Sequence, residues 1–391
     1  MRILLATDWP GEGGGVEKYV AQIARALREA GDEARILTSS AGEGAAVADH
    51  VAFGTHRMLP QTVLQIANPV AAREMRRVVA DFRPDVVHVS MFEMHLSPSV
   101  LAAVQTVPLV VNIAYYKPIC PIGLKLLPDD SLCAVQPGLV CWRGGCTSLP
   151  QWLRDRPRYA RIRREIDRAA VVTCSRWLQV ELSQAAIDAD WACWPVGPPG
   201  PTFLRAPAAD PLFVFIGRLT REKGAELLVQ ALALIRADGS SARVRIVGDG
   251  PLRPRLERLV DELGLHQAVE FLGWVAPERV EEQLQDAWAL VAPSLWAEPL
   301  GLAALEAVVR GVPVIASAAG GHAETVEHEV SGLLFANGDV NALAGHLAEV
   351  ASGRAFATHS VPLATVREVQ TRHDLDQHIV WLRGKFADLA A

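Results

Sequence analysis

Two glutamates, Glu298 and Glu306, lie eight residues apart in the apolar segment 293–313, PSLWAEPLGLAALEAVVRGVP. Two carboxylates could perform general acid and base catalysis, or they could accept hydrogen bonds from the hydroxyls of one ligand. A buried helix with two incidental acids is the simpler alternative. A glutamate inside such an apolar run is costly unless it is paired or liganded, so we expect these side chains to bind a ligand.

The segment around the two glutamates has the pattern of a buried helix. Pro299 suits a first helical position, the apolar run 302–309 follows, and Gly311 ends the helix. Helical rise predicts about 12 Å between the two acidic positions, which is near the length of a nucleotide-sugar from ribose to hexose. Because the N–H groups of a first turn favour an anion, the segment could hold a diol, a diphosphate and a second diol.

Two cations stand near the predicted carboxyl edge of the same sheet. Arg218 follows the strand-like stretch 212–217, and Lys223 precedes the next helix, in GRLTREKG. These side chains could bind a diphosphate and stabilise the charge that builds on it as it departs. Surface cations beside a turn are the alternative. The turn VGDGP, at 247–251, could accommodate a base or ribose, or could simply reverse the chain.

The spacing of strands and helices predicts how these residues are positioned. Strands separated by helices of 10 to 15 residues indicate parallel sheets covered on both faces. In the second half, strand-like stretches occur at 212–217, 243–248, 269–273, 289–294, 313–317 and 332–335. In the first half they occur at 2–7, 34–39, 84–90, 107–113 and 171–174. The fold class is therefore α/β, with two Rossmann-like, doubly wound parallel-sheet domains.

A stiff linker rich in proline and glycine separates the two halves. Its prolines are Pro195, Pro198, Pro199 and Pro201. We predict an N-terminal domain over 1–197, a C-terminal domain over 198–372 and a final helical segment over 373–391.

Two features of the first half could contribute to a ligand site. The loop GEGGG ends in Gly14 and Gly15 and precedes a helical pattern over 16–30, so its backbone could approach a phosphate. Its spacing is not that of the dinucleotide fingerprint, and it could merely turn the chain. His88 and His95 lie at or after the end of strand 84–90, where open α/β sheets bind ligands; packed structural histidines are the alternative.

Residues 114–150 form a long loop rich in proline and glycine, which needs something to fix it. Four thiolates could hold structural zinc or an iron–sulfur cluster, but their spacings are not those of common zinc ribbons or fingers. Four separately packed cysteines are the alternative. The cysteines concerned are Cys120, Cys133, Cys141 and Cys146.

The segment 151–168, QWLRDRPRYARIRREIDR, contains seven arginines and three acids. Such a basic patch suits an anionic acceptor, a diphosphate lipid or a peripheral contact at the inner face of a membrane. A solvated helix with internal ion pairs is the alternative.

Composition narrows the class of protein. The chain has 391 residues, 50% of them hydrophobic, and a net charge of -6. These values indicate a folded protein of two domains and argue against nucleic-acid binding. No apolar run approaches the roughly 20 residues of a membrane span, and the start MRILLATDWP lacks the pattern of a signal peptide. We expect a cytoplasmic enzyme whose cysteines are reduced or metal-bound.

Several motifs together resemble the retaining GT-B glycosyltransferases of family 4. They are GRLTREKG, IVGDGP, VEFLGWV, PSLWAEPLGLAALEAVVRGVPVIAS and GG…VSGLLF in the second half, with GGGVEKYV and PDVVH in the first. The long loop resembles that of a subgroup with cysteines in the N-terminal domain. The likeness covers nearly the whole chain, and the two glutamates with the upstream arginine and lysine are its most specific part.

The resemblance implies roles for individual residues. Arg218 and Lys223 would bind the diphosphate, Glu298 the hydroxyls of the donor sugar and Glu306 the ribose. The other residues implied in donor binding are Gly14, Gly15, Gly217, Gly248, Gly250, Gly273, Leu300, Gly301 and Leu302. The final helix would cross back to the first domain, and catalysis would need no metal or other cofactor.

One departure from the resemblance concerns catalysis. Relatives with such a loop often have His-Asp six residues before the first Cys-Pro, where this chain has Ala114 and Tyr115. The histidine that many relatives place against the transferred sugar is therefore missing from its usual position. Leaving-group contacts alone could support the chemistry, or His88, His95 or Tyr115 could assist it.

The resemblance implies transfer of a sugar, with retention, from a nucleotide-sugar, by family precedent a UDP-sugar. The acceptor would be a hydroxyl of a glycan, a lipid-linked molecule or a small natural product. Two alternatives remain at this point: a sugar-nucleotide epimerase or hydrolase of the same fold, and a catalytically silent nucleotide-sugar-binding partner of a larger complex.

Overall fold

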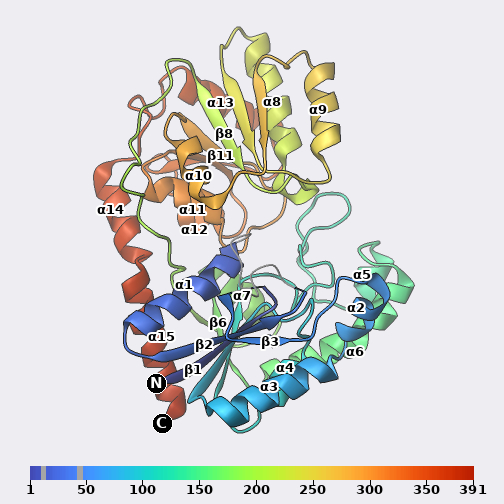
Figure 1. Cartoon of the computed structure of the whole chain (residues 1–391). Coiled ribbons are helices and arrows are strands. Elements are labelled where there is room, and N and C mark those ends of the chain that lie inside the picture. The colour runs from blue at the N-terminus through green and yellow to red at the C-terminus, as the bar shows by residue number, and fades with distance from the viewer. Residues whose placement is uncertain (10–14, 42–46) are drawn as a thin grey trace. The chain divides into compact units, whose positions relative to one another are not determined.

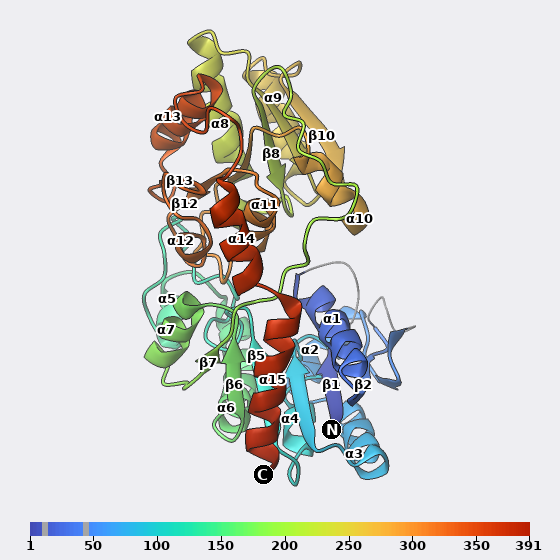
Figure 2. The same ribbon diagram turned by 90° about the vertical axis from the view of Figure 1, so that its left-hand side faces the viewer.

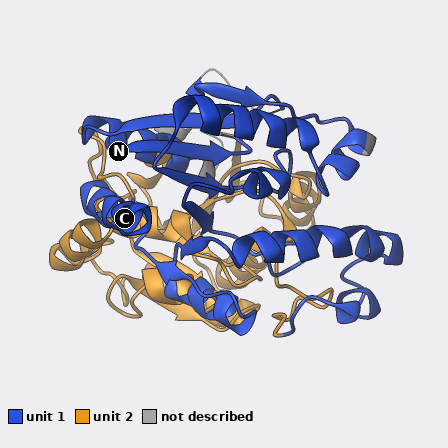
Figure 3. Cartoon of the chain, turned by 90° about the horizontal axis from the view of Figure 1, so that it is seen from below, with its two compact units in different colours: residues 1–123, 135–195, 375–391 blue, residues 124–134, 196–374 orange. Residues whose placement is uncertain are grey.

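The computed structural model describes residues 1–9, 15–41 and 47–391 (Figure 1). Contacts divide the chain into two compact units, coloured in Figure 3. Unit 1 comprises residues 1–123, 135–195 and 375–391, and unit 2 comprises residues 124–134 and 196–374.

Unit 1 is built on a parallel sheet with the strand order β3-β2-β1-β4-β5-β6-β7, counted over the described residues. The strands are β1 (Arg2–Thr7), β2 (Glu33–Ser39), β3 (His50–Ala52), β4 (Val86–Ser90), β5 (Leu109–Ile113), β6 (Ala170–Thr173) and β7 (Asp190–Trp191). The helices are α1 (Gly15–Glu29), α2 (Met58–Leu64), α3 (Pro69–Phe82), α4 (Ser99–Ala103), α5 (Leu139–Arg143), α6 (Leu149–Ile166), α7 (Arg176–Gln184) and α15 (Leu375–Ala390). Figure 2 shows α15, the last helix, lying along this unit.

Unit 2 repeats the design with the strand order β10-β9-β8-β11-β12-β13, all parallel. The strands are β8 (Leu212–Ile216), β9 (Arg243–Val247), β10 (Val269–Gly273), β11 (Ala289–Ala292), β12 (Val314–Ser317) and β13 (Gly332–Phe335). The helices are α8 (Ala225–Ala237), α9 (Arg253–Glu262), α10 (Pro277–Val280), α11 (Leu302–Val309), α12 (His322–Thr325), α13 (Val340–Ala351) and α14 (Leu363–Arg372), with 3₁₀ turns η2 (Arg221–Lys223) and η3 (Glu281–Leu284).

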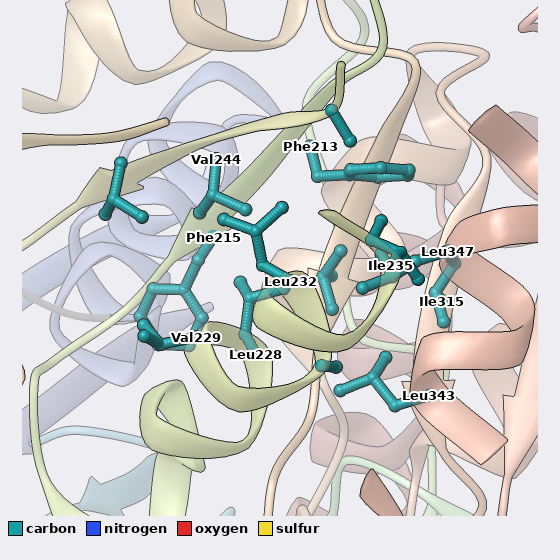
Figure 4. Packing of buried hydrophobic residues seen from close by; sticks show 14 of the residues in the cluster. Phe213, Phe215, Leu228, Val229, Leu232, Ile235, Val244, Ile315, Leu343 and Leu347 are labelled. Atoms are coloured by element: carbon teal, nitrogen blue, oxygen red, sulfur yellow. The ribbon is translucent and has the colours of Figure 1, made fainter. Parts of the chain in front are cut away.

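Buried apolar side chains cover both faces of the second sheet. On one face, Phe213 and Phe215 of β8 belong to the same buried cluster as Leu228 and Leu232 of α8 and Leu343 of α13 (Figure 4). On the other face, side chains of α11 pack with those of β8, β11 and β12. Both faces are apolar, which is why these strands read as continuous hydrophobic runs.

The predicted α/β class and the Rossmann-like parallel sheets are confirmed. The short edge strands β3 and β7 were not predicted, since two or three residues carry no readable period. Residues 277–284 form only the short helix α10 followed by η3.

The boundary between the units falls at residues 195 and 196, two residues before the predicted one. Residues 124–134 of the cysteine-containing loop group with unit 2, although they were expected in the N-terminal domain. There they form a hairpin-like turn with an antiparallel bridge between Leu126 and Leu132. Asp130 of this turn forms an ion pair of 2.7 Å with Arg221. The local sequence could not predict this contact, because the two residues lie far apart in the chain.

Candidate active site

Glu298 and Lys223 lie together at the carboxyl edge of the second sheet. Lys223 Nζ donates to Glu298 Oε1 over 2.7 Å, and Ser294 Oγ donates to the same oxygen over 2.8 Å. Lys223 ends η2 in the loop after β8, and Ser294 follows the neighbouring strand β11. The parallel pairing of these two strands therefore brings the three side chains to one place.

The environment keeps Glu298 ionised. Burial alone would raise its pKa, but the charge of Lys223, assisted by His322 and hydrogen bonds, lowers it to about 2. Burial lowers the pKa of His322. The ammonium of Lys223 also lies 5.2 Å from the centre of the Trp296 ring, a cation–π contact. The site thus holds a buried carboxylate and an ammonium side by side.

The helix between the two glutamates begins later than predicted. Residues 298–300 are held by the loop after β12, because Glu298 forms a parallel bridge with Gly320 and accepts the Gly321 N–H over 2.7 Å. Gly301 then turns the chain with φ 81° and ψ 51°, and α11 starts at Leu302. The predicted start at Pro299 is wrong, because these long-range hydrogen bonds override the helical preference of the local sequence.

The backbone at the start of α11 packs closely against His322. A Cβ at Gly301 would lie 2.3 Å from His322 Cδ2, so only glycine fits there. Gly301 supplies no side-chain cap to the helix. The backbone N–H groups at 302–304 are consequently left for water or a ligand. Glu306 is half-buried about one helical turn inside α11, instead of the predicted two turns.

The second predicted cation, Arg218, is placed differently from Lys223. Its side chain is 73% exposed, and the carboxylate of Glu222 lies 3.7 Å away. Such a side chain can reorient to meet an anion. Glu222 itself is held by Thr220, whose hydroxyl donates to it over 2.7 Å.

The predicted donor-site glycines lie where the ends of β8, β9 and β10 approach one another. A Cβ at Gly248 would lie 2.0 Å from the carbonyl oxygen of Gly217, and one at Gly250 would lie 2.5 Å from that of Leu219. Gly273 accepts the Gly248 N–H over 2.7 Å. Backbone packing alone therefore requires glycine at 248 and 250. Leu300 is buried, Gly15 opens α1, and Gly14 lies outside the described residues.

The two candidate histidines of unit 1 are buried in aromatic surroundings. His88 lies in the middle of β4, with its ring near Tyr19 and Phe386, and burial lowers its pKa to about 3. His95 packs against the rings of Trp9 and His56. Packing of this kind matches the structural alternative for both residues.

Tyr115 belongs instead to a cluster after the ends of β1, β4 and β5. Its hydroxyl donates to Glu93 Oε2 over 2.6 Å, while the buried Glu93 Oε1 has no hydrogen-bond partner among the described residues. Burial raises the pKa of Glu93, and Arg158 donates to its main-chain carbonyl oxygen over 2.9 Å. Asp8 accepts the N–H groups of Met94, His95 and Leu96 over 2.7 to 3.0 Å.

The sequence interpretation missed Asp8, Glu93, Ser294 and His322. A polar residue directly after a buried strand is the signal that could have identified Asp8 and Ser294. It also missed a hollow of about 480 Å³ in unit 2, between the 124–134 turn and the start of α8. Its lining includes Asp130, Arg221, Glu226 and Asn337.

The remaining predictions concern the cysteine loop and α6. Among the described residues, no group of three or more histidine, cysteine or acidic side chains is arranged to hold a metal ion. Cys120, Cys141 and Cys146 belong to unit 1 and Cys133 to unit 2. The cysteine metal site stays a prediction, which elemental analysis of the purified protein can test.

Most arginines of 151–168 form ion pairs or hydrogen bonds within unit 1. Arg154 pairs with Asp155, Arg163 with Asp167, and Arg164 and Arg168 with Glu165. Arg158 is buried, and Arg161 donates to the carbonyl oxygen of Ile66. The expected basic patch is therefore largely a helix with internal ion pairs, which was the alternative interpretation.

Comparisons with known proteins agree with this architecture. Residues 14–193 match the family model described as "Glycosyl transferase 4-like domain", and residues 202–360 match "Glycosyl transferases group 1". The chain is similar to the amylovoran biosynthesis glycosyltransferase AmsK of Erwinia amylovora, with 30% identity over 46% of this chain and 44% of the relative. The matched regions span only 31 to 45% of the length of such curated relatives.

Solved structures are similar over the whole chain. Sucrose-phosphate synthase of Thermosynechococcus elongatus gives a TM-score of 0.74 at 23% identity and covers 100% of this chain and 99% of that one. Alr3699/HepE of Anabaena in complex with UDP gives 0.70 at 20% identity, with 99% of each chain covered. The chain therefore consists of a glycosyl transferase 4-like domain and a group 1 glycosyl transferase domain, and its fold is GT-B.

Proposed function

We propose that this protein is a retaining glycosyltransferase of family 4 that transfers a sugar from a UDP-sugar to an acceptor hydroxyl. The observation that carries the proposal is the contact between Lys223 and Glu298 beside the uncapped start of α11. It supplies a cation for a diphosphate, backbone donors for its oxygens and a carboxylate for sugar hydroxyls.

The ionisation of Glu298 favours a binding role over acid catalysis. A general acid of the glycosidase type needs a raised pKa, whereas the pKa of Glu298 is lowered to about 2. A permanent carboxylate accepts hydrogen bonds from sugar hydroxyls and positions the sugar. Glu306 would accept those of the ribose, one turn inside α11.

The proposed reaction breaks the bond between the anomeric carbon and the diphosphate oxygen, whose electron pair stays on the leaving diphosphate. The acceptor oxygen forms the new bond on the same face of the sugar, and its proton passes to a phosphate oxygen. Lys223, the exposed Arg218 and the start of α11 would stabilise the departing charge. This positive charge supports catalysis without a metal, and assay after dialysis against EDTA tests that part.

For the acceptor, we propose that unit 1 contributes the pair Tyr115 and Glu93 in place of the missing histidine. The unpartnered Glu93 oxygen supports this, since a buried carboxylate oxygen without a donor is a candidate for a substrate hydroxyl. The relative AmsK functions in amylovoran biosynthesis, which supports a glycan acceptor; lipid-linked and natural-product acceptors fit the same chemistry. We expect the cytoplasm, where nucleotide-sugars are made, as its location.

A donor panel with the Glu298→Gln variant tests the proposal. Purified full-length protein is incubated with UDP-, GDP- and dTDP-sugars, and released sugar and transfer products are measured. We expect turnover with a UDP-sugar, reduced by a factor on the order of 10² to 10³ in Glu298→Gln, with UDP still bound in calorimetry. The matched control is Glu226→Gln, which alters a glutamate on α8 that pairs with Arg255. Near-normal turnover in Glu298→Gln would sink the assignment.

A further inference from the structure

Helix α5 and the first half of α6 present a group of exposed apolar side chains, which we call the α5–α6 face. Its members are Val135, Leu139, Val140, Trp142, Leu149 and Leu153, which are 37 to 53% exposed. Single exposed apolar residues are ordinary, but six within nineteen residues of chain are not. The α5–α6 face therefore requires an explanation beyond folding of the chain.

Hydrogen bonds join α5 to the start of α6, so the apolar residues belong to one substructure. Trp152 Nε1 donates to the carbonyl oxygen of Gly138, the residue before α5, over 2.9 Å. Ser148 Oγ accepts the Gln151 N–H and caps α6. Leu149 and Leu153 are four residues apart and lie on one side of α6. Figure 1 shows α5 beside the start of α6 at one end of unit 1.

The charge of this region is opposite to that of the chain as a whole. Residues 135–156 contain Arg143, Arg154 and Arg156 and one acid, Asp155, whereas the whole chain carries a net charge of -6. Asp155 is only 3% exposed and forms an ion pair with Arg154. The exposed charges of residues 135–156 are thus cationic.

Exposed apolar side chains and an exposed arginine also occur on and beside helix α2. Residues 53–68 contain no acid, and Met58 and Val63 are 79% and 66% exposed. Arg57 is also exposed at the start of α2. Figure 1 shows α2 at the same end of unit 1 as α5.

We propose that the α5–α6 face binds the surface of an anionic phospholipid bilayer. Apolar side chains with Trp and exposed arginines are the combination that inserts shallowly among acyl chains while the cations contact lipid phosphates. In the described residues, no helix is long and apolar enough to cross a membrane.

Charge complementarity favours a lipid surface over a second copy of the chain. In a two-fold dimer each surface meets an identical patch, so a symmetric contact through this face would bring like-charged arginines together. An anionic bilayer instead pairs each of them with a phosphate. The inference goes beyond the proposed sugar transfer, and it holds or fails independently of the residues that bind the donor.

Vesicle sedimentation with the full-length protein tests the proposal. We expect the protein to sediment with vesicles of phosphatidylcholine and phosphatidylglycerol and not with phosphatidylcholine alone, and to be released by 0.5 M salt. Trp142→Ser/Leu153→Ser and Arg143→Glu/Arg156→Glu should each weaken binding at least tenfold. Melting curves establish that each variant is folded.

A matched control alters an exposed apolar residue and an exposed arginine elsewhere in unit 1. Val380→Ser/Arg25→Glu changes a valine on α15 that is 71% exposed and an arginine on α1 whose side chain is 68% exposed. This control should bind vesicles as the wild type does. Donor hydrolysis without vesicles should be the same in all these variants, which separates membrane binding from sugar transfer.

Three results would overturn the proposal: no binding to anionic vesicles, wild-type binding by both face variants, or a concentration-dependent dimer that Trp142→Ser/Leu153→Ser abolishes. The dimer would show that a second copy covers this face. Equal binding to vesicles with and without phosphatidylglycerol would contradict the role of the arginines.

Discussion

The carboxyl edges of the two sheets hold buried carboxyl groups with opposite electrostatics. In unit 2, Glu298 lies against Lys223, and its pKa is lowered to about 2. In unit 1, burial raises the pKa of Asp8 to about 7 and also raises that of Glu93. The difference shows that burial alone does not set the charge of such a group; an adjacent cation does.

The comparison also separates the proposed roles of the two units. A permanent carboxylate and an ammonium in unit 2 suit a ligand that carries both hydroxyls and a diphosphate. Carboxyl groups whose pKa is raised, as in unit 1, suit the binding of neutral hydroxyls, because either protonation state can form a hydrogen bond.

The largest expected effect follows from removing the cation of unit 2. Lys223→Met leaves Glu298 buried without its ion pair, so we expect a loss of about 3 kcal/mol in the free energy of unfolding and at least a hundredfold loss of turnover. Urea unfolding and donor hydrolysis measure the two effects. Arg221→Met, in the same 3₁₀ turn but paired with Asp130, is the control and should change both far less. Equal effects of the two variants would remove the distinction between the cations.

The pH dependence of stability should have opposite signs at the two edges. The folded pKa of Asp8, about 7, exceeds the ordinary value of 3.8. The destabilisation by this group therefore begins as the pH rises above 3.8 and is complete above 7. Relative to Asp8→Asn, the wild type should therefore lose roughly 2 to 3 kcal/mol of unfolding free energy as the pH rises from 5 to 8.

Glu298 provides the counterpart for that measurement. Its folded pKa of about 2 is below the ordinary value of 4.5, so its stabilising contribution is fully present above pH 4.5 and is lost as the pH falls through 2. Relative to Glu298→Gln, the wild type should lose stability from pH 6 to pH 3, by about 2 kcal/mol. For each variant, the measured quantity is the difference in unfolding free energy between wild type and variant as a function of pH. If this difference changed with pH in the same direction for Asp8→Asn and Glu298→Gln, the electrostatic comparison would be contradicted.

The smallest expected effect concerns the hydroxyl of Tyr115. Tyr115→Phe removes its hydrogen bond to Glu93, so the KM for the acceptor should rise by a factor of about five to ten, while donor hydrolysis is unchanged. Tyr159→Phe, which removes a hydroxyl bonded to the Lys117 carbonyl oxygen, is the matched control. An unchanged acceptor KM in Tyr115→Phe would place the acceptor elsewhere in unit 1.

Local sequence predicted the parts of the site that depend on local order. Strands such as β1 and β8 are runs of apolar residues, and the cations of GRLTREKG directly follow one of them, so Lys223 could be placed at a sheet edge. Glu298 was recognised because a carboxylate in an apolar segment needs a partner. The two-unit α/β organisation follows from the same periodicity.

Only the tertiary structure decided which residues meet. Helix α11 starts at Leu302 because Glu298 forms a parallel bridge with Gly320 and accepts the N–H of Gly321, some twenty residues later. Ser294 joins Lys223 because β8 and β11 are neighbours, and Glu93 meets Tyr115 because β4 and β5 are. Residues 124–134 group with unit 2 through contacts such as that of Asp130 with Arg221. Sequence determines periodicity and chemical type over a few residues, whereas these contacts join positions far apart in the chain, and only the folded backbone sets them.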